Sequence, residues 1–189
     1  MSKILQFKKG ILYIVDTSSQ IPEQFFISET HRHKGIPTSN HFCNTTEGVF
    51  FFNSYGAWLY DGEELKDIFV NTDDQDKKQQ RIDPATWRAF VNDNNQCGFN
   101  PVSNEVIILK SNYQSSDDTD GDSYTYDVYA DAWTFGRKKF HIEHTSGLRN
   151  LTNFSHVGAD LSLAYIAKEF EHTDTIAKLF LWDYTGQTT

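Results

Sequence analysis

Hydrophobic and polar positions along the chain form a pattern that predicts pairs of β-strands. In each pair a hydrophobic run leads through a turn to a second strand, which ends in an aromatic residue and an aspartate. The clear pairs are Gly48–Asn53 with Ala57–Gly62, Glu105–Lys110 with Ser123–Asp127, and Leu161–Ile166 with Lys178–Asp183. A fainter pair joins Gly10–Asp16 to Gln24–Ser28.

The strand pairs recur along the chain, with starts near residues 11, 49, 106 and 161. Repeats of roughly 40–60 residues built from short antiparallel strands are typical of propeller blades. We therefore expect an all-β chain of about four blades, with residues 1–189 forming a single β-propeller domain or a segment of a larger propeller. No strand is recognisable after Trp182 to complete the last blade, which favours an incomplete ring, completed by further sequence or by a neighbouring chain.

Polar segments separate the strand pairs. Residues 31–47 and 71–82 are predicted to be loops, and residues 111–122 form a polar insert rich in Ser and Asp. Residues 123–135 predict a long strand region with a kink near Ala130 and Asp131.

Residues 83–91 allow two interpretations. Asp83 is a good N-cap and Pro84 suits the first helical position, which predicts a helix of about two turns. The segment Trp87–Val91 also alternates well enough to form an extended strand. The pattern does not decide between them.

The composition is that of a globular β-protein, with 38% hydrophobic and 15% aromatic residues. Phe and Tyr, which favour strands, make up most of the aromatic residues. The chain has no apolar run of about 18 residues, so we expect no membrane insertion. Met1–Ile4 lacks the apolar core of a secretory signal, so the chain is expected to be made in a cytoplasm.

The charge balance restricts the partners. A net charge of −9 argues against a duplex-binding surface, which needs clustered Lys and Arg to neutralise phosphates. It also argues against docking on anionic membranes. Sequence-specific binding of nucleic acid is therefore not expected.

An acidic segment is the first candidate for metal binding. Asp118, Asp120 and Asp122 alternate around Gly121, and carboxylates on such a turn can hold Ca²⁺. The segment fails the EF-hand pattern because Ser116 occupies the first ligand position. An exposed hairpin tip kept soluble by charge is the expected structure.

A second candidate combines histidine and cysteine. His31, His33, His41 and Cys43 have the side chains that Zn²⁺ prefers, but their spacing matches no closed structural site. We expect the histidines to be surface residues. Cys43 and Cys97 are expected to be small buried strand residues and not a disulfide or a ligand pair.

No catalytic motif accompanies these candidates. The chain contains neither a nucleophile elbow nor a phosphate-binding loop, so no enzyme activity and no cofactor are expected. Four tryptophans could stack on sugars, but their periodic positions favour packing between blades. They are Trp58, Trp87, Trp133 and Trp182.

Three segments resemble parts of large structural proteins of tailed bacteriophages. They are His41–Asn53 ending in Leu59–Gly62, Trp87–Phe90 followed by Gly98–Pro101 and Asn104–Ile108, and Tyr126–Val128 with Ala132–Gly136. The resemblance covers roughly residues 36–186. It implies a virion protein of the tail-hub or neck-associated propeller type, which docks onto other virion structural proteins in a homo- or hetero-oligomeric assembly.

Two alternatives remain open at this point. Kelch-like and other propellers share parts of the same pattern, so a cytoplasmic interaction scaffold has the same expected fold. A glycan-binding or glycan-hydrolysing propeller would use the tryptophans and the acidic segment. A fold alone does not decide between these functions.

Overall fold

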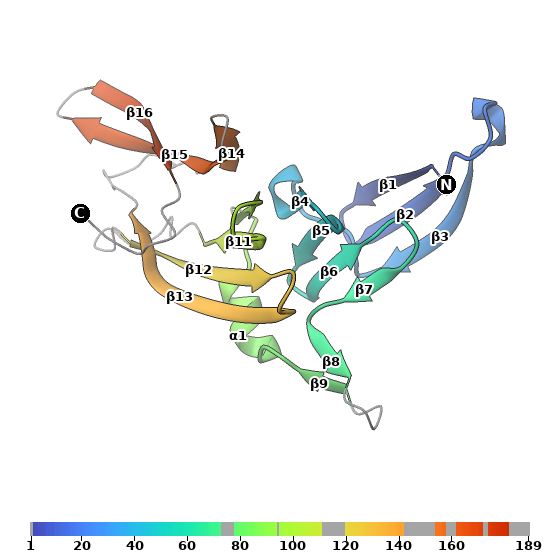
Figure 1. Cartoon of the computed structure of the whole chain (residues 1–189), viewed down its shortest axis with the longest axis horizontal. Coiled ribbons are helices and arrows are strands. Elements are labelled where there is room, and N and C mark those ends of the chain that lie inside the picture. Colours follow the sequence, from blue (N-terminus) through green and yellow to red (C-terminus); the bar gives the residue numbers. More distant parts are fainter. Residues whose placement is uncertain are drawn as a thin grey trace. The chain divides into compact units, whose positions relative to one another are not determined.

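The computed structural model describes residues 2–72, 78–93, 95–110, 120–141, 154–157, 162–171 and 174–181 (Figure 1). Nearly all of its regular structure is antiparallel β-sheet, as predicted. The sheets have the strand orders β1-β2-β3, β4-β5-β6-β7, β8-β9, β10-β11-β12-β13 and β14-β15-β16. In every sheet, strands that are neighbours in the sequence are also hydrogen-bonded neighbours.

The strands and helices have the following bounds. They are β1 (Lys3–Lys8), β2 (Ile11–Asp16), η1 (Pro22–Gln24), β3 (Phe26–Arg32), η2 (Ser39–His41), β4 (Phe42–Thr45), β5 (Gly48–Asn53), β6 (Gly56–Tyr60), β7 (Leu65–Asp67), β8 (Val70–Thr72), β9 (Lys78–Gln80), α1 (Pro84–Phe90), β10 (Gln96–Asn100), β11 (Glu105–Leu109), β12 (Asp120–Asp127), β13 (Ala132–His141), β14 (Phe154–Val157), β15 (Ser162–Glu171) and β16 (Asp174–Leu181). The repeat starts predicted near residues 11, 49, 106 and 161 fall at or beside the second strand of each three- or four-stranded sheet.

The chain divides into two compact units. Unit 1 comprises Met1–Phe42 and Glu47–Asp93, and unit 2 comprises Cys43–Thr46 and Asn94–Thr189. Among the described residues each sheet is open, with an edge strand on either side. The structure therefore shows an all-β chain of serial antiparallel sheets.

The core of unit 1 lies between the β1-β2-β3 sheet and strands β5 and β6. Leu12 and Ile14 point from β2 into this core and are fully buried, together with Phe51 of β5 and Trp58 of β6. Burying one such side chain stabilises a fold by about 1.5–3 kcal/mol. Further members of the core are Ile36, Tyr60, Leu5, Phe7 and Leu65.

Polar contacts fix the connection between these two groups of strands. Asn53 at the end of β5 donates from Nδ2 to the carbonyl oxygens of His33, at 2.9 Å, and Gly35, at 2.6 Å. Gly35 has no room for a side chain, because a Cβ atom there would overlap the backbone of Lys8 and Ile11. The close approach of backbone to backbone therefore requires glycine at this position.

The aspartates that end the predicted strands have a common structural role. Asp61 follows β6 and accepts from the amides of Glu63 and Glu64 at 3.0 and 2.8 Å through Oδ1. Asp127 ends β12 and accepts from the amides of Tyr129 and Ala130 at 2.9 and 2.8 Å. Each carboxylate thus satisfies the turn that leads into the last strand of its sheet. The hydrogen bonds from the Glu64 amide, the Lys66 ammonium and the Glu63 amide hold the pKa of Asp61 well below its usual range.

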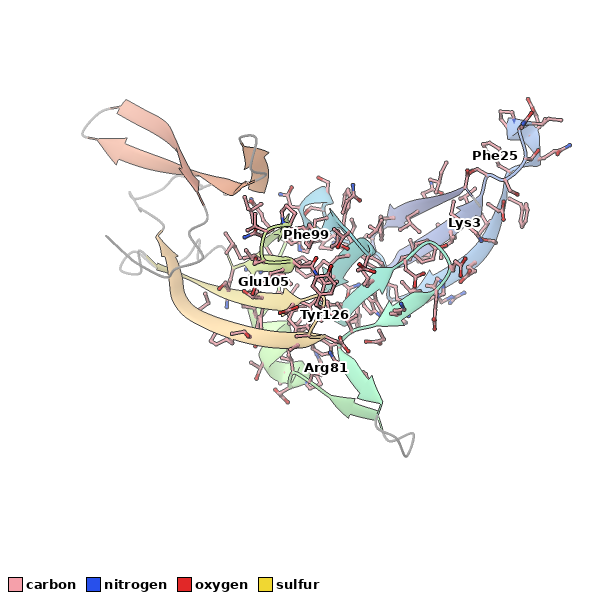
Figure 2. All side chains as sticks on the ribbon, viewed as in Figure 1. Lys3, Phe25, Arg81, Phe99, Glu105 and Tyr126 are labelled. Atoms are coloured by element: carbon pink, nitrogen blue, oxygen red, sulfur yellow. The ribbon has the colours of Figure 1, made fainter. Side chains whose placement is uncertain are left out.

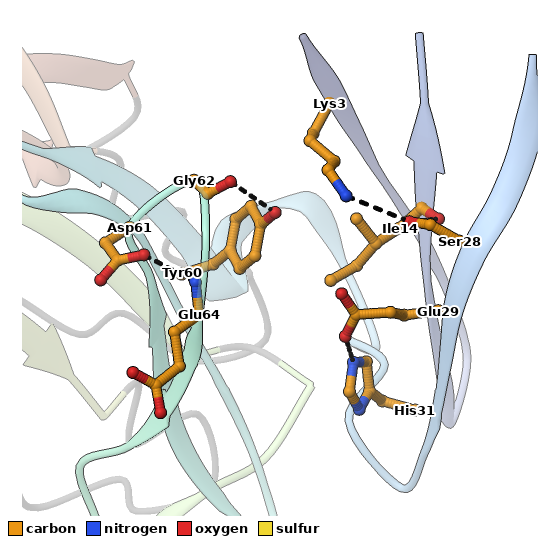
Figure 3. Close-up of polar contacts among 9 residues, drawn as sticks. All are labelled: Lys3, Ile14, Ser28, Glu29, His31, Tyr60, Asp61, Gly62 and Glu64. Atoms are coloured by element: carbon orange, nitrogen blue, oxygen red, sulfur yellow. Dashed lines mark hydrogen bonds and ion pairs between the residues drawn. The ribbon is translucent and has the colours of Figure 1, made fainter. Parts of the chain in front are cut away.

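The aromatic residue before each of these aspartates serves the same turn. The hydroxyl of Tyr60 donates to the carbonyl oxygen of Gly62 at 2.9 Å (Figure 3). The hydroxyl of Tyr126 donates to Asp131 Oδ1 at 2.6 Å. The aromatic–aspartate pair therefore stabilises the turn before the last strand in two different sheets.

Helix α1 resolves the ambiguity of residues 83–91 in favour of a helix. The Asp83 carboxylate accepts from the Thr86 amide at 2.8 Å, which is an N-cap hydrogen bond. Trp87 and Phe90 are buried, and the indole nitrogen of Trp87 donates to the carbonyl oxygen of Asn53 at 2.7 Å. The alternation of Trp87–Val91 that suggested a strand arises because Trp87 and Phe90 lie on one buried face of the helix.

Three predictions about local structure need correction. The predicted loops at 31–47 and 71–82 contain η2 and β4, and the β8–β9 pair, respectively. Backbone hydrogen bonds form these short polar strands without the hydrophobic alternation that a sequence pattern detects. The predicted kink near Ala130 and Asp131 is a complete hairpin turn between β12 and β13, with Asp131 at a φ of +49°.

We expect Trp87→Phe to lower the free energy of unfolding by about 1–3 kcal/mol, because it leaves the buried carbonyl of Asn53 without its indole donor. Urea denaturation followed by circular dichroism measures this change. Trp133→Phe, at a half-buried position on β13, is the matched control and should cost less. An equal loss in both variants would contradict the structural role assigned to the Trp87 hydrogen bond.

Candidate functional site

Where the structure describes them, the candidate metal ligands do not come together in one site. Among the described residues, no group of three or more His, Cys, Asp and Glu side chains is placed to hold a metal ion. His31 Nε2 lies 2.9 Å from Glu29 Oε2 (Figure 3), whereas the ring of His33 packs on Tyr55 at 5.2 Å. In the acidic segment, Asp118 and the side chain of Asp120 lie outside the described residues, so the expected exposed tip remains a prediction.

His41 corrects the expectation that these histidines are surface residues. Its side chain is fully buried, with the ring 4.7 Å from that of Phe52. Nε2 lies 3.0 Å from the carbonyl oxygen of Asn92, and Nδ1 lies 2.8 Å from the hydroxyl of Thr38. Since a carbonyl only accepts, Nε2 carries the proton and the Thr38 hydroxyl donates to Nδ1. His41 is thus a neutral core residue that links two segments of unit 1.

Burial lowers the pKa of His41 below its ordinary value of 6.5, although the Asn92 carbonyl and the Asp93 carboxylate oppose the shift. The neutral form is therefore favoured in the folded chain, and the unfolded chain takes up a proton first as the pH falls. Protonation consequently favours unfolding, and the stability that neutral His41 supplies is lost below about pH 6.5.

We expect the free energy of unfolding of the wild type to fall between about pH 7 and pH 5. In His41→Asn this pH-dependent loss should be smaller, because the titrating group is gone. Urea denaturation at each pH provides the measurement. His33→Asn, at an exposed position, is the control and should keep the wild-type slope. A His41→Asn profile parallel to the wild type would show that His41 contributes nothing to acid sensitivity.

The two cysteines lie next to each other in unit 2. Cys97 on β10 is buried and Cys43 on β4 is half-buried, and both are free thiols. Burial, together with the hydrogen-bonded Cys43 thiol, raises the pKa of the Cys97 thiol well above its ordinary value. The prediction of small buried strand residues is confirmed for Cys97 and holds only in part for Cys43.

A thiol reagent should therefore distinguish the two cysteines in the folded chain. We expect fast modification of Cys43 and at least about 10-fold slower modification of Cys97, because only the thiolate reacts and burial suppresses it. Cys43→Ser should abolish the fast phase and Cys97→Ser should keep it. Two fast phases of equal size in the folded wild type would contradict the assigned burial.

The tryptophans also have a structural role. Trp58 is 4% exposed and Trp87 is fully buried, so neither presents a face on which a sugar could stack. The Nζ of Lys34 lies over the Trp58 ring, 5.5 Å from its centroid. Trp133 is half-buried and packs on Tyr126 at 5.0 Å, and Trp182 lies outside the described residues.

Exposed apolar residues gather at the N-terminal sheet. Five of the ten large hydrophobic residues that are exposed in the described part of the chain lie between positions 4 and 27. They are Ile4, Ile21, Phe25, Phe26 and Ile27. Figure 2 shows Phe25 at the end of this sheet, where β2 is connected to β3.

Strand register places some of these residues on one face of the β1-β2-β3 sheet. Val15 pairs with Ile4 on one side and with Ile27 on the other, and forms an apolar row across all three strands. Ile4 is 52% exposed and Ile27 is 54% exposed. We call this side, opposite to the core residues Leu12 and Ile14, the outer face of the sheet.

The opposite end of the outer face is basic. Ile11 pairs with Lys8 and with Arg32, and both charged residues are exposed. The Nζ of Lys8 lies 5.6 Å from the ring of Tyr13, which occupies the middle of the same face. The outer face therefore combines an apolar half with a cationic half.

Polar groups near the apolar row are satisfied within the sheet. Lys3 Nζ lies 3.8 Å from Asp16 Oδ2 and 3.4 Å from Ser28 Oγ, and Ser28 Oγ donates to the carbonyl oxygen of Ile14 at 3.0 Å (Figure 3). Hydrogen bonds from Ser18 lower the pKa of Asp16. These contacts fix the strand ends, while Ile4 and Ile27 of the outer face stay exposed.

Sequence analysis did not identify this surface as a candidate site. The available signal was the uninterrupted hydrophobic run from Ile11 to Val15, which departs from the alternation expected of a strand with one wet face. The run predicts the strand, but by itself it does not distinguish the core face from the outer face.

Comparison of the chain with protein-family models, with curated proteins and with solved structures finds no match. A membrane-spanning helix needs about 20 largely apolar residues, and none of the described helices meets that requirement.

Proposed function

We propose that the chain is a structural component of a tailed-phage virion, in which a β-propeller scaffold docks onto other tail or neck proteins. The observation that carries this proposal is the series of three- and four-stranded antiparallel sheets, each formed by consecutive strands. Such a series is the arrangement from which propeller blades are built.

The recurring turn chemistry supports the interpretation of these sheets as repeats. Asp61 and Asp127 each accept from the amides two and three positions ahead, at the turn before the last strand of two different sheets. The hydroxyls of the preceding Tyr60 and Tyr126 donate within the same turns, to different acceptors. The same aspartate hydrogen bonds at the same place in two sheets are expected of structural repeats. The segments that resemble phage structural proteins include both tyrosine–aspartate pairs.

The environment of the tryptophans favours a scaffold over a glycan-binding protein. A sugar-binding surface needs an aromatic face open to solvent, whereas Trp58 and Trp87 fill the interior of unit 1. In contrast, the outer face of the β1-β2-β3 sheet offers exposed Ile4 and Ile27 for docking. Apolar side chains gathered on one exposed face mark interaction surfaces more often than isolated ones.

Mass spectrometry of density-purified particles from the source material tests the proposal. We expect peptides of this chain to co-sediment with capsid and tail proteins, at a constant ratio to them across the gradient. The ratio should survive a wash at high ionic strength, since stable virion interfaces bury large apolar areas. An abundant host protein of similar size is the control and should be depleted. Absence of the chain from washed particles would contradict a virion role.

A further inference from the structure

We propose that the outer face of the β1-β2-β3 sheet is an interface that binds a second copy of this chain. The inference deepens the proposed scaffold role, on which it rests, by naming the partner of this surface. It is carried by two independent observations, the apolar central strand and the uneven distribution of charge.

The central strand β2 is apolar on both faces. Leu12 and Ile14 fill the core on one side, while Ile11, Tyr13 and Val15 lie on the outer face. An antiparallel sheet with one face in water normally alternates apolar and polar side chains, whereas continuous apolar runs are typical of strands that are covered on both sides. The sequence of β2 is therefore that of a covered strand.

The residues that flank β2 leave its apolar outer face accessible. Ile4 on β1 is 52% exposed and Ile27 on β3 is 54% exposed, although both side chains extend the row through Val15. The buried cluster of unit 1 accounts for the inner face, where Leu5 and Phe7 of β1 join it. A partner that covered Ile4, Val15 and Ile27 would gain apolar contact area at the centre of its interface.

Charge indicates what kind of partner fits. Residues 1–36 contain five Lys and Arg against three Asp and Glu, a net charge of +2 in a chain of net charge −9. The remainder of the chain therefore carries −11. On the outer face the excess is visible as exposed Lys8 and Arg32, with exposed Lys9 in the adjoining turn.

A second copy is a partner of complementary sign, because the chain outside residues 1–36 has a net charge of −11. Opposite charges steer association and fix its orientation. Two basic outer faces repel each other, so the contact joins the outer face of one copy to an acidic surface elsewhere on the next. Such a head-to-tail contact produces a ring if the rotation closes and a filament if it does not.

Sedimentation velocity of the purified full-length chain tests the inference. We expect the weight-average sedimentation coefficient to rise with protein concentration between about 1 µM and about 500 µM. Raising the ionic strength from about 0.05 M to about 0.5 M should weaken association, because the cationic half of the interface is screened. A single monomeric species under all these conditions overturns the inference.

Matched variants locate the interface. Ile4→Lys combined with Ile27→Lys should raise the dissociation constant at least about 10-fold, since it places charge in the apolar row. Val102→Lys is the control, because Val102 is 74% exposed on the β10–β11 turn of unit 2; it should change the constant less than about twofold. Equal weakening by the control and the double variant overturns the assignment.

A charge variant tests the second observation. Arg32→Glu should raise the dissociation constant about 10-fold or more at low ionic strength, whereas Arg88→Glu on α1 should have little effect. Circular dichroism and melting temperature confirm that each variant is folded before its association is compared. Tighter association of Arg32→Glu overturns the proposed complementarity.

The two proposals fail in different ways. Loss of self-association leaves the virion role intact if the chain still sediments with particles. If the chain is absent from particles but still self-associates with rising concentration, the interface stands and the virion role is contradicted. Binding of a polyanion such as heparin by a chain that stays monomeric would assign the cationic half to another partner and overturn the inference.

Discussion

The packing of one antiparallel sheet onto another is the interaction on which unit 1 depends. Leu12 and Ile14 of β2 reach Phe51 and Trp58 of the following strands, and these side chains have almost no contact with solvent. Hydrophobic burial supplies the driving force, but it does not by itself select one register or one approach of the strands. The amide of Asn53 adds that selectivity, because its two donors reach backbone carbonyls in the chain segment after β3.

The sequence pattern predicted the strands that alternate or run apolar, including the pairs β2–β3, β5–β6, β11–β12 and β15–β16. It also placed an aspartate at strand ends, and the structure shows why Asp61 and Asp127 stand there: each carboxylate binds two amides of a turn. The pattern failed for β8 and β9, two short strands of mostly polar sequence that pair through their backbones. Backbone pairing of this kind does not require a periodic pattern of hydrophobic residues, so the sequence pattern does not reveal it.

The environment of individual side chains was harder to predict than their secondary structure. His41 has the same residue type as the exposed His33, yet it is buried because Thr38 and the Asn92 carbonyl satisfy both of its ring nitrogens. One of those partners lies 51 positions away in the sequence, so no local pattern could reveal it. The residue type of His41 indicated which chemistry was possible. Only its tertiary contacts show that it stabilises the core.

The proposed scaffold role is compatible with these features and requires no chemistry at any side chain. Turns closed by aspartate recur in two sheets, and Phe51 and Trp58 belong to the buried core of unit 1. A sheet that is ordered before binding can present an apolar face, as β2 does with Tyr13 and Val15, at small entropic cost on binding. The function of the chain would then depend on which partner surface covers that face.

Hydroxyl-radical footprinting of Ile4, Tyr13 and Ile27 is the most direct test of this account. The measurement compares the oxidation rates of these side chains in dilute monomer and in the assembled state, with Val102 as the reference for unassociated surface. The account predicts that assembly protects all three outer-face residues while the reactivity of Val102 stays unchanged. Equal oxidation of Ile4, Tyr13 and Ile27 in both states would show that the outer face remains in solvent and would contradict the central claim.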